Sequence, residues 1–250
     1  MNDTMQLIES KIQKMAGFSQ RPDRGSFRSK KGQPLAQYFD HTNLSPVARK
    51  QDIKRLCAEA MEYSMKAVCV APDRVGLATT LLKNSTVRIA TVISFPHGNS
   101  IAIRQNVQSV IDLGADEIDM VAPIGKLKDK QYSEVMDVIA EAAYAAEDHY
   151  LKIILETSQL TKEEKIWASL CAIYAGAHML KTSTGFADGG VTLEDLQLLR
   201  SIAGEQIGLK ASGGIRTYKF ALQCIEQGAD RIGSSNSFKI LEESNSERVS

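Results

Sequence analysis

The chain has 250 residues, of which 43% are hydrophobic, and this is enough to build one large domain with its own core. Its formal net charge is zero, so the composition does not indicate a general nucleic-acid binder or a membrane-surface protein. No apolar run approaches the roughly 18 residues of a membrane-spanning helix. The four cysteines form no C-x-x-C pair and fall in apolar segments, which favours a reducing, cytoplasmic setting.

The first 35 residues differ from the rest of the chain. Residues 5–15 have the pattern of a short amphipathic helix, and the polar, basic stretch S-Q-R-P-D-R-G-S-F-R-S-K-K-G-Q-P follows. Asp3, Glu9 and Asp23 argue against a transit peptide, and the stretch has no signal-peptide core. We therefore predict an extension over residues 1–35, either a solvated arm or a subunit-contact helix. A domain of residues 36–241 and a polar tail of residues 242–250 follow it.

From residue 36 onward, short β-like runs alternate with helical patterns in which apolar residues recur at spacings of three and four. Helix starts are indicated by Ser45 with Pro46, Thr161 with Glu164, and Thr192 with Asp195. Eight strand–helix units in this length predict a (β/α)8 TIM barrel. A doubly wound open sheet is the alternative, weakened because no G-x-G-x-x-G follows the first strand. The predicted strands are residues 37–41, 67–71, 89–94, 117–121, 152–156, 179–182, 208–211 and 231–234.

Two lysines stand out, Lys181 in H-M-L-K-T-S-T-G-F and Lys210 in G-L-K-A-S-G-G-I. Each lies near the end of a short apolar run, where burial disfavours the charged ammonium. Their strands are neighbours in the predicted barrel, roughly 4.8 Å apart. Repulsion between two inward-pointing lysines would lower the pKa of one of them and make it a nucleophile. A snorkelling side chain or a simple salt bridge is the alternative for either lysine.

Carboxylates follow the same pattern at strand ends, where barrel enzymes carry their catalytic groups. Asp119 in D-E-I-D-M-V alternates with apolar residues, which predicts a side chain that points inward. It is either the counter-ion of a lysine or a proton shuttle. Asp40 in Y-F-D-H-T either bonds the backbone at the strand end or joins the site. Cys69 is a further polar residue near the end of a strand.

Small residues after the last strands predict a phosphate site. S-G-G-I-R follows the seventh strand and I-G-S-S-N the eighth, and both offer backbone N–H groups near helix starts. T-S-T-G after Lys181 adds further N–H and hydroxyl donors. The predicted substrate contacts are Thr182, Gly185, Ser212, Gly213, Gly214, Gly233, Ser234 and Ser235.

Metal chemistry is a weaker alternative. His41 and His97 are both expected at strand ends on the active face, as a zinc-dependent aldolase would require. His149 and His178 fall at helix–strand joints on the opposite rim. Two histidines without a clear third ligand do not make a metal site, so we expect neither a metal nor a cofactor.

Taken together, K-T-S-T-G-F, K-A-S-G-G-I-R-T, G-A-D-E-I-D-M-V, Y-F-D-H-T and R-I-G-S-S resemble the deoxyribose-phosphate aldolase family from about residue 36 to residue 241. The resemblance implies a class I aldolase that interconverts 2-deoxy-D-ribose 5-phosphate with acetaldehyde and D-glyceraldehyde 3-phosphate. It implies that Lys181 forms the Schiff base, that Lys210 lowers the pKa of Lys181 and that Asp119 relays protons. By the same resemblance Asp40 lies beside that relay, Cys69 lines the site, and the chain is a homo-oligomer, a dimer.

Three features depart from the family pattern. The chain ends in S-E-R-V-S without the C-terminal tyrosine that many members use, and its N-terminal arm is longer than in compact members. Phe186 stands where some relatives carry a lysine. Other readings therefore stay open. They are a Schiff-base or transaldolase-like barrel for a different sugar phosphate, a non-catalytic phosphosugar-binding barrel, and an RNA- or membrane-associated role for the basic residues 21–31.

Overall fold

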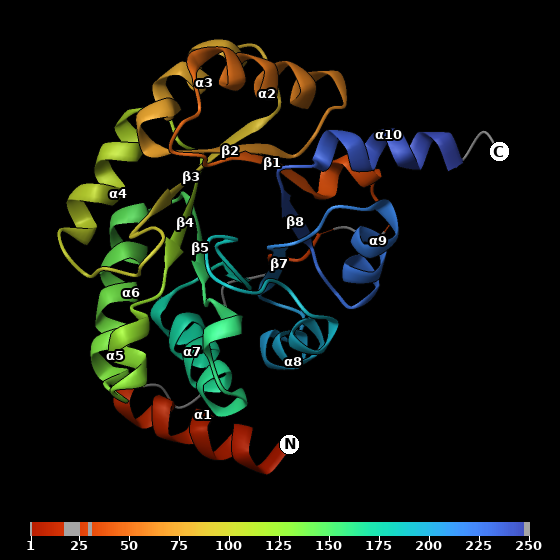
Figure 1. Ribbon diagram of the computed structural model, residues 1–250. Coiled ribbons are helices and arrows are strands. Elements are labelled where there is room, and N and C mark those ends of the chain that lie inside the picture. Colours follow the sequence, from red (N-terminus) through yellow and green to blue (C-terminus); the bar gives the residue numbers. More distant parts are fainter. Residues whose placement is uncertain (1, 18–25, 30–31, 248–250) are drawn as a thin grey trace.

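The computed structural model describes residues 2–17, 26–29 and 32–247. Within these residues, eight parallel strands close into a barrel, and β1 pairs with β8 (Figure 1). The predicted (β/α)8 barrel is confirmed, and the open doubly wound sheet is wrong. The strands are β1 (Phe39–Asn43), β2 (Ala67–Val70), β3 (Arg88–Ile93), β4 (Glu117–Val121), β5 (Tyr150–Ile154), β6 (Met179–Lys181), β7 (Gly208–Ser212) and β8 (Arg231–Ser234).

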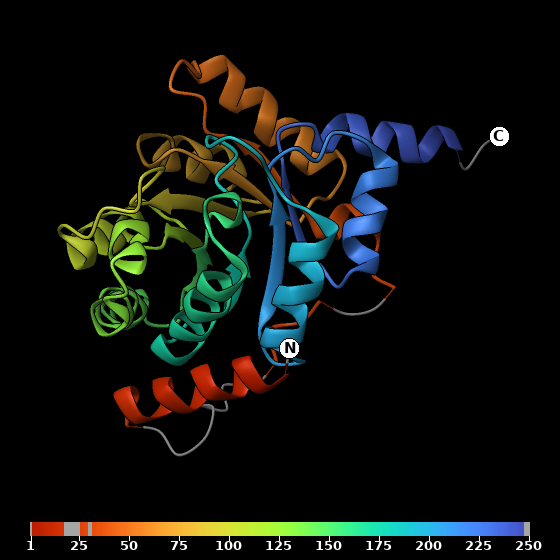
Figure 2. The same ribbon diagram turned by 60° about the horizontal axis from the view of Figure 1, so that its bottom comes forward.

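Helices surround the barrel, and α1 lies across one end of it (Figures 1 and 2). The α-helices are α1 (Asn2–Ala16), α2 (Lys50–Glu62), α3 (Val75–Leu82), α4 (Ile103–Asp112), α5 (Ile124–Lys128), α6 (Tyr132–Ala146), α7 (Lys162–Ala175), α8 (Leu193–Ala203), α9 (Tyr218–Glu226) and α10 (Ser237–Glu247). Short 3₁₀ helices are η1 (Leu35–Tyr38), η2 (Pro72–Arg74) and η3 (Thr157–Gln159). None of the described helices is long and apolar enough to cross a membrane.

Local signals explain where the elements begin. Thr161 accepts a hydrogen bond from the Glu164 backbone N–H at 3.3 Å, and the Glu164 carboxylate accepts one from the Thr161 N–H at 2.7 Å, which is a capping box. At the start of α8, the Thr192 hydroxyl accepts a hydrogen bond from the Asp195 backbone N–H at 3.1 Å and acts as the N-cap. The predicted helix start at residues 45–46 is wrong, because α2 begins only at Lys50. The first strand begins at Phe39 rather than at residue 37, because η1 occupies residues 35–38.

Strand side chains alternate between two environments. Ile118 and Met120 of β4 point outward into the main apolar core under the helices. Glu117 and Asp119 of the same strand are fully buried and meet charged partners from other strands. A separate small apolar cluster is formed by Cys69, Ala90 and Val92. The outer core stabilises the barrel, while its interior holds buried charge.

The extension packs on its own barrel. In α1, Ile8 and Ile12 are buried, and Glu9 accepts a hydrogen bond at 2.9 Å from the hydroxyl of Tyr174 in α7. This helix is therefore not a solvated arm. Of the basic residues 21–31, only 26–29 lie among the described residues, and Arg28 there pairs with Asp230. The predicted polar tail is mostly the end of α10, and residues 248–250 lie outside the described residues.

Candidate active site

Lys181 and Lys210 occupy paired positions on β6 and β7. Their Nζ atoms lie 2.9 Å and 2.8 Å from the same atom, Oδ2 of Asp119 on β4. The structure thus brings together the two predicted lysines and the predicted carboxylate, with Asp119 between them. All three side chains are buried.

Asp119 also meets a third cation. The Nζ of Lys152 on β5 lies 2.7 Å from Oδ1, the other carboxylate oxygen. Burial alone would raise the pKa of Asp119, but the charges of Lys152, Lys181 and Lys210 outweigh it and hold that pKa well below its usual range. Asp119 is therefore an anion in the resting site.

Lys210 contacts two carboxylates. Besides Asp119, its Nζ contacts Oδ2 of Asp40, whose other oxygen accepts from Arg231 Nε at 2.8 Å. Burial favours the neutral amine, yet Asp119 and Asp40 outweigh it and raise the pKa of Lys210. Likewise burial would raise the pKa of Asp40, but Arg231 and Lys210 lower it. Lys210 is a permanent cation, and the Asp40 carboxylate bonds to Lys210 and Arg231 rather than to the backbone at the strand end.

Lys181 has a different balance. Its described ion-pair partner is Asp119, a carboxylate that two other lysines share. Burial is the largest influence and lowers the pKa of Lys181, Asp119 opposes it, and the nearby charge of Lys210 lowers the pKa further. The net shift is downward, so the pKa of Lys181 is lowered while that of its neighbour Lys210 is raised.

Three further charged residues contact this group of side chains and were not predicted from the sequence: Glu117, Lys152 and Arg231. Glu117 lies 2.7 Å from Lys152 Nζ and 2.9 Å from an Arg231 guanidinium nitrogen, and all three side chains are buried. Glu117 and Lys152 stand inside predicted strands, as Lys181 does, so the rule that found Lys181 could have found them. The buried ionic network is Asp40, Glu117 and Asp119 with Lys152, Lys181, Lys210 and Arg231. The half-exposed Arg88 lies 3.5 Å from Glu117 at the edge of this network, where solvent screens its charge.

The charge count of the buried network favours a resting site in which one of its four cations is neutral. With all seven groups charged, cations exceed anions by one, and an unbalanced buried charge is costly. With Lys181 neutral, the remaining charges balance. Lys181 is also the member of the network that lines the large cavity above it.

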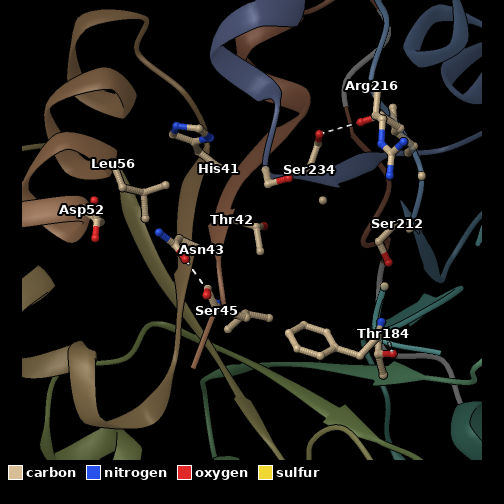
Figure 3. Close-up of a pocket in the computed structure, with 18 of the residues that line it drawn as sticks. His41, Thr42, Asn43, Ser45, Asp52, Leu56, Thr184, Ser212, Arg216 and Ser234 are labelled. Carbon is tan, nitrogen blue, oxygen red and sulfur yellow. Dashed lines mark hydrogen bonds between the residues drawn. The ribbon is translucent and has the colours of Figure 1, made fainter. Parts of the chain in front are cut away.

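That cavity has a volume of about 510 Å³ and lies over the carboxyl ends of β1, β6, β7 and β8. Figure 3 shows Asp52 and Leu56 of α2 on one side and Ser212, Thr184 and Arg216 on the other. Most of the predicted substrate contacts line it: Gly185, Ser212, Gly213, Gly214, Gly233, Ser234 and Ser235.

Two predicted substrate contacts lie elsewhere. The hydroxyl of Thr182 donates to the Ser212 carbonyl at 2.9 Å and accepts from the Ser212 N–H at 3.0 Å, so it joins β6 to β7. Because strand side chains alternate, the residue after the inward Lys181 points away from the interior. Cys69 is buried beside Ala90 and Val92 and is absent from the cavity lining. Burial, with the nearby charge of Asp119, raises the pKa of its thiol.

The glycines of the two loops are required for different structural reasons. Gly213 and Gly214 have φ angles of +89° and +82°, which glycine adopts without strain. A Cβ on Gly233 would lie 3.0 Å from Cε of Lys210, so this glycine makes room for the lysine chain. The Ser234 hydroxyl donates to the Ile215 carbonyl at 2.7 Å and ties the two loops together. A further residue of this rim, Arg216, is exposed and lines the cavity, although the sequence analysis quoted only its motif.

The remaining walls account for the histidines and for Phe186. His41 lines the cavity and bonds Glu59 of α2 at 2.7 Å, whereas His97 is exposed. Among the described residues, no three His, Cys, Asp or Glu side chains are grouped so that they could hold a metal ion. Phe186 also lines the cavity, and its ring packs edge-on against Phe95 at 5.1 Å.

A closed parallel barrel with a buried lysine amine beneath a cavity at its carboxyl end is the architecture of a Schiff-base aldolase. The profile of the DeoC/LacD family aldolase matches residues 35–240, and the chain belongs to that family.

Individual relatives agree with the family match. The deoxyribose-phosphate aldolase of Thermococcus kodakarensis is 49% identical over 215 residues, which cover 83% of this chain and 96% of the relative. Among solved structures, a candidate deoxyribose-phosphate aldolase from Coccidioides immitis has a TM-score of 0.84 at 34% identity and covers 98% of both chains. A deoxyribose phosphate aldolase from Aeropyrum pernix, described as a unique tetramer, has a TM-score of 0.77 at 30% identity, covering 85% of this chain and 92% of its own.

Proposed function

We propose that this aldolase interconverts 2-deoxy-D-ribose 5-phosphate with acetaldehyde and D-glyceraldehyde 3-phosphate, and that Lys181 is its Schiff-base residue. One observation carries the assignment of the lysine: within the ionic network, Lys181 lines the cavity and is the cation in excess. The names and high coverage of the relatives support the choice of substrate.

The reaction follows from the neutral amine. Lys181 Nζ attacks C1 of the open-chain sugar, and loss of water gives a protonated imine. The imine withdraws electrons, so that the C2–C3 bond breaks as the C3 hydroxyl loses its proton and D-glyceraldehyde 3-phosphate leaves. The enamine that remains is protonated at C2, and hydrolysis releases acetaldehyde and the free lysine.

Asp119 and Lys210 serve these proton transfers. The Asp119 carboxylate lies 2.9 Å from Lys181 Nζ, close enough to take up and return protons directly or through one water. Lys210, held as a cation by Asp119 and Asp40, supplies the positive charge that disfavours a second one on Lys181.

The substrate phosphate fits the rim after β7 and β8. Gly213, Gly214, Ser234 and Ser235 offer small side chains and backbone N–H groups there, and Arg216 supplies a cation. Binding the phosphate at the rim, away from Lys181, orients the carbons that react. Phe186, which replaces the lysine of some relatives, leaves Arg216 as the charged group of this rim.

Oligomeric state and location are part of the same proposal. We propose a homo-oligomer, a dimer, on the family resemblance, and equilibrium sedimentation tests it, with a monomer as the contradicting result. All four cysteines are buried free thiols, which supports a reducing, cytoplasmic setting.

Borohydride trapping tests the function. The protein is reduced in the presence of 2-deoxy-D-ribose 5-phosphate, and the adduct is located by peptide mass mapping. An adduct on Lys181 is the expected result, and one on Lys210 would reverse the two roles. Turnover with a different sugar phosphate but not with this one would favour the alternative aldolases. Binding of the sugar phosphate without any adduct would favour a non-catalytic barrel.

A further inference from the structure

The amino-terminal end of the barrel, opposite the cavity, is covered by residues 26–29, which we call the base strap. These residues precede the family match, which begins at residue 35. The Phe27 N–H donates to the Gln206 carbonyl at 2.6 Å, and the Ser26 hydroxyl donates to the Glu205 carbonyl at 2.8 Å. The strap is thereby fixed to the loop that leads into β7.

Phe27 is partly buried and packs at the amino-terminal base of the barrel. Its ring packs edge-on against Tyr150 at 5.5 Å and against His178 at 4.7 Å, and its carbonyl accepts from the Tyr150 hydroxyl at 3.2 Å. Gly208, two residues before the inward Lys210, faces the interior as well. A Cβ on Gly208 would clash with Cε of the buried Met179 and lie 2.9 Å from the Phe27 carbonyl oxygen, so the Met179 side chain and the strap backbone fill the base of the barrel together.

Ion pairs hold the other half of the strap. Arg28 Nε lies 2.8 Å from Asp230, and its guanidinium also reaches Glu205 at 2.9 Å. The Ser29 N–H and hydroxyl donate to the Asp230 carboxylate and carbonyl at 3.1 Å and 2.7 Å. Asp230 directly precedes Arg231, so the strap is tied to the strand that carries a cation of the ionic network.

Short steps connect the strap to Lys181. Tyr150 is the register partner of Glu117, and Glu117 contacts Lys152 at 2.7 Å, which in turn contacts Asp119 at 2.7 Å. Interactions between these charges depend on the absence of water, because water weakens them severalfold. Solvent comes near this end, since the Arg88 side chain that contacts Glu117 is 48% exposed.

We propose that the base strap is a positioning element of the aldolase site, in which Phe27 excludes water from the ionic network and so keeps Lys181 available as a free amine. The inference rests on the proposed function for its effect on turnover. The charged and titratable groups that face Lys181 are Asp119, Lys210 and Cys69, and those around the base are Glu117, Lys152, Arg231, Arg88, Lys66, Tyr38, Tyr150, His178, Asp230, Arg200, Arg28 and Glu205.

The test compares Phe27→Ala with Ile12→Ala. Both remove a large apolar side chain of the extension that packs with the main apolar core. Phe27 also packs edge-on against Tyr150, the register partner of Glu117, whereas Ile12 lies in α1. In Phe27→Ala, water at the base weakens the burial that lowers the pKa of Lys181. The acid limb of the kcat/KM–pH profile should move up by about half a unit, a loss of roughly threefold at pH 7 that high pH restores. Ile12→Ala should keep the parent profile, and Phe27→Tyr should restore it.

A second readout does not require turnover. The pH dependence of Lys181 labelling by an amine-reactive reagent, mapped by mass spectrometry, should shift upward in Phe27→Ala and not in Ile12→Ala. Equal labelling profiles in parent and Phe27→Ala would overturn the role of the strap, even in a protein with full activity. A labelling shift in Phe27→Ala, together with a parent protein that has no aldolase turnover, would instead refute the proposed function and leave the strap's effect on Lys181 established.

Discussion

The two ends of the barrel interior both carry buried cations and carboxylates, but they differ in how many carboxylates each cation contacts and in its access to the cavity. At the carboxyl end, Lys181 shares one carboxylate with two other lysines and opens onto the cavity. At the amino-terminal end, Lys152 and Arg231 each contact two carboxylates and lie beneath the base strap. Under the proposed function, the number of opposite charges in contact, together with access to the cavity, selects Lys181 as the nucleophile and leaves the other cations as structural charges.

The largest expected effect comes from removing the reactive lysine. Lys181→Met should lower kcat by about four orders of magnitude or more, because no imine can form. The fold should survive, since this change removes the one cation in excess and leaves the network balanced. Turnover of the sugar phosphate and the urea midpoint measure the two effects. Lys128→Met, a lysine on the surface, is the matched control and should change neither.

Removing Lys210, a cation that contacts two carboxylates, should reduce both stability and activity, whereas Lys181→Met should reduce activity alone. Lys210→Leu leaves Asp119 and Asp40 with one partner fewer, and breaking a buried pair costs about 3–5 kcal/mol of unfolding free energy. It also raises the pKa of Lys181, so activity at pH 7 should fall by about a hundredfold and recover partly at higher pH. A Lys210→Leu protein with the stability and the pH profile of the parent would contradict the contrast between the two lysines.

How far the sequence predicts this site depends on the range of each signal. Lys181 and Lys210 were predicted because a lysine in a short apolar run is a local anomaly and neighbouring strands bring such residues together. Arg231 is not marked in this way, because it follows Asp230 at the start of a strand instead of standing within an apolar run, and its partners Asp40 and Glu117 lie 191 and 114 residues away. The helix α1 was predicted from its pattern, but the surface that it covers, around Tyr174, was not.

Thr182 shows two sequence signals that disagree. T-S-T-G offers donors and predicts a substrate contact, yet period-two alternation along a strand turns the residue after Lys181 away from the interior. The alternation rule, which needs only the sequence, assigns the Thr182 hydroxyl to the contact between β6 and β7 that the structure shows.

Smaller effects are expected at the rim of the cavity. Arg216→Ala should raise KM for the phosphorylated substrate about tenfold with little change in kcat, because a charge-assisted contact to phosphate contributes about 1.5–3 kcal/mol. Arg55→Ala is the matched control: it is also an exposed arginine of the cavity lining, but Asp52 and Glu59 lie 3.7 Å and 3.8 Å from its guanidinium. Equal KM changes in the two variants would place the phosphate elsewhere in the cavity.

The smallest effect is the pH dependence of stability, and it tests the asymmetry of the two lysines without any substrate. Burial, with the charge of Lys210, lowers the pKa of Lys181, so the unfolded chain binds this proton more tightly than the folded chain. Unfolding free energy therefore rises with pH between the lowered pKa and the ordinary lysine value of about 10.4. Lys210 has a raised pKa in the folded chain, so its contribution to stability is complete at every pH below the ordinary lysine value of about 10.4. Lys210 therefore adds no slope in this window.

Urea unfolding of the parent and of Lys181→Met from pH 6 to pH 10 measures this slope. Lys181→Met should be the more stable protein at the acid end, and its advantage should shrink as the pH rises, because the parent is then relieved of the cost of protonating a buried amine. Curves that stay parallel would mean that Lys181 has the same pKa in the folded and unfolded chains. In that case the charge balance of the network would not explain the reactivity of Lys181.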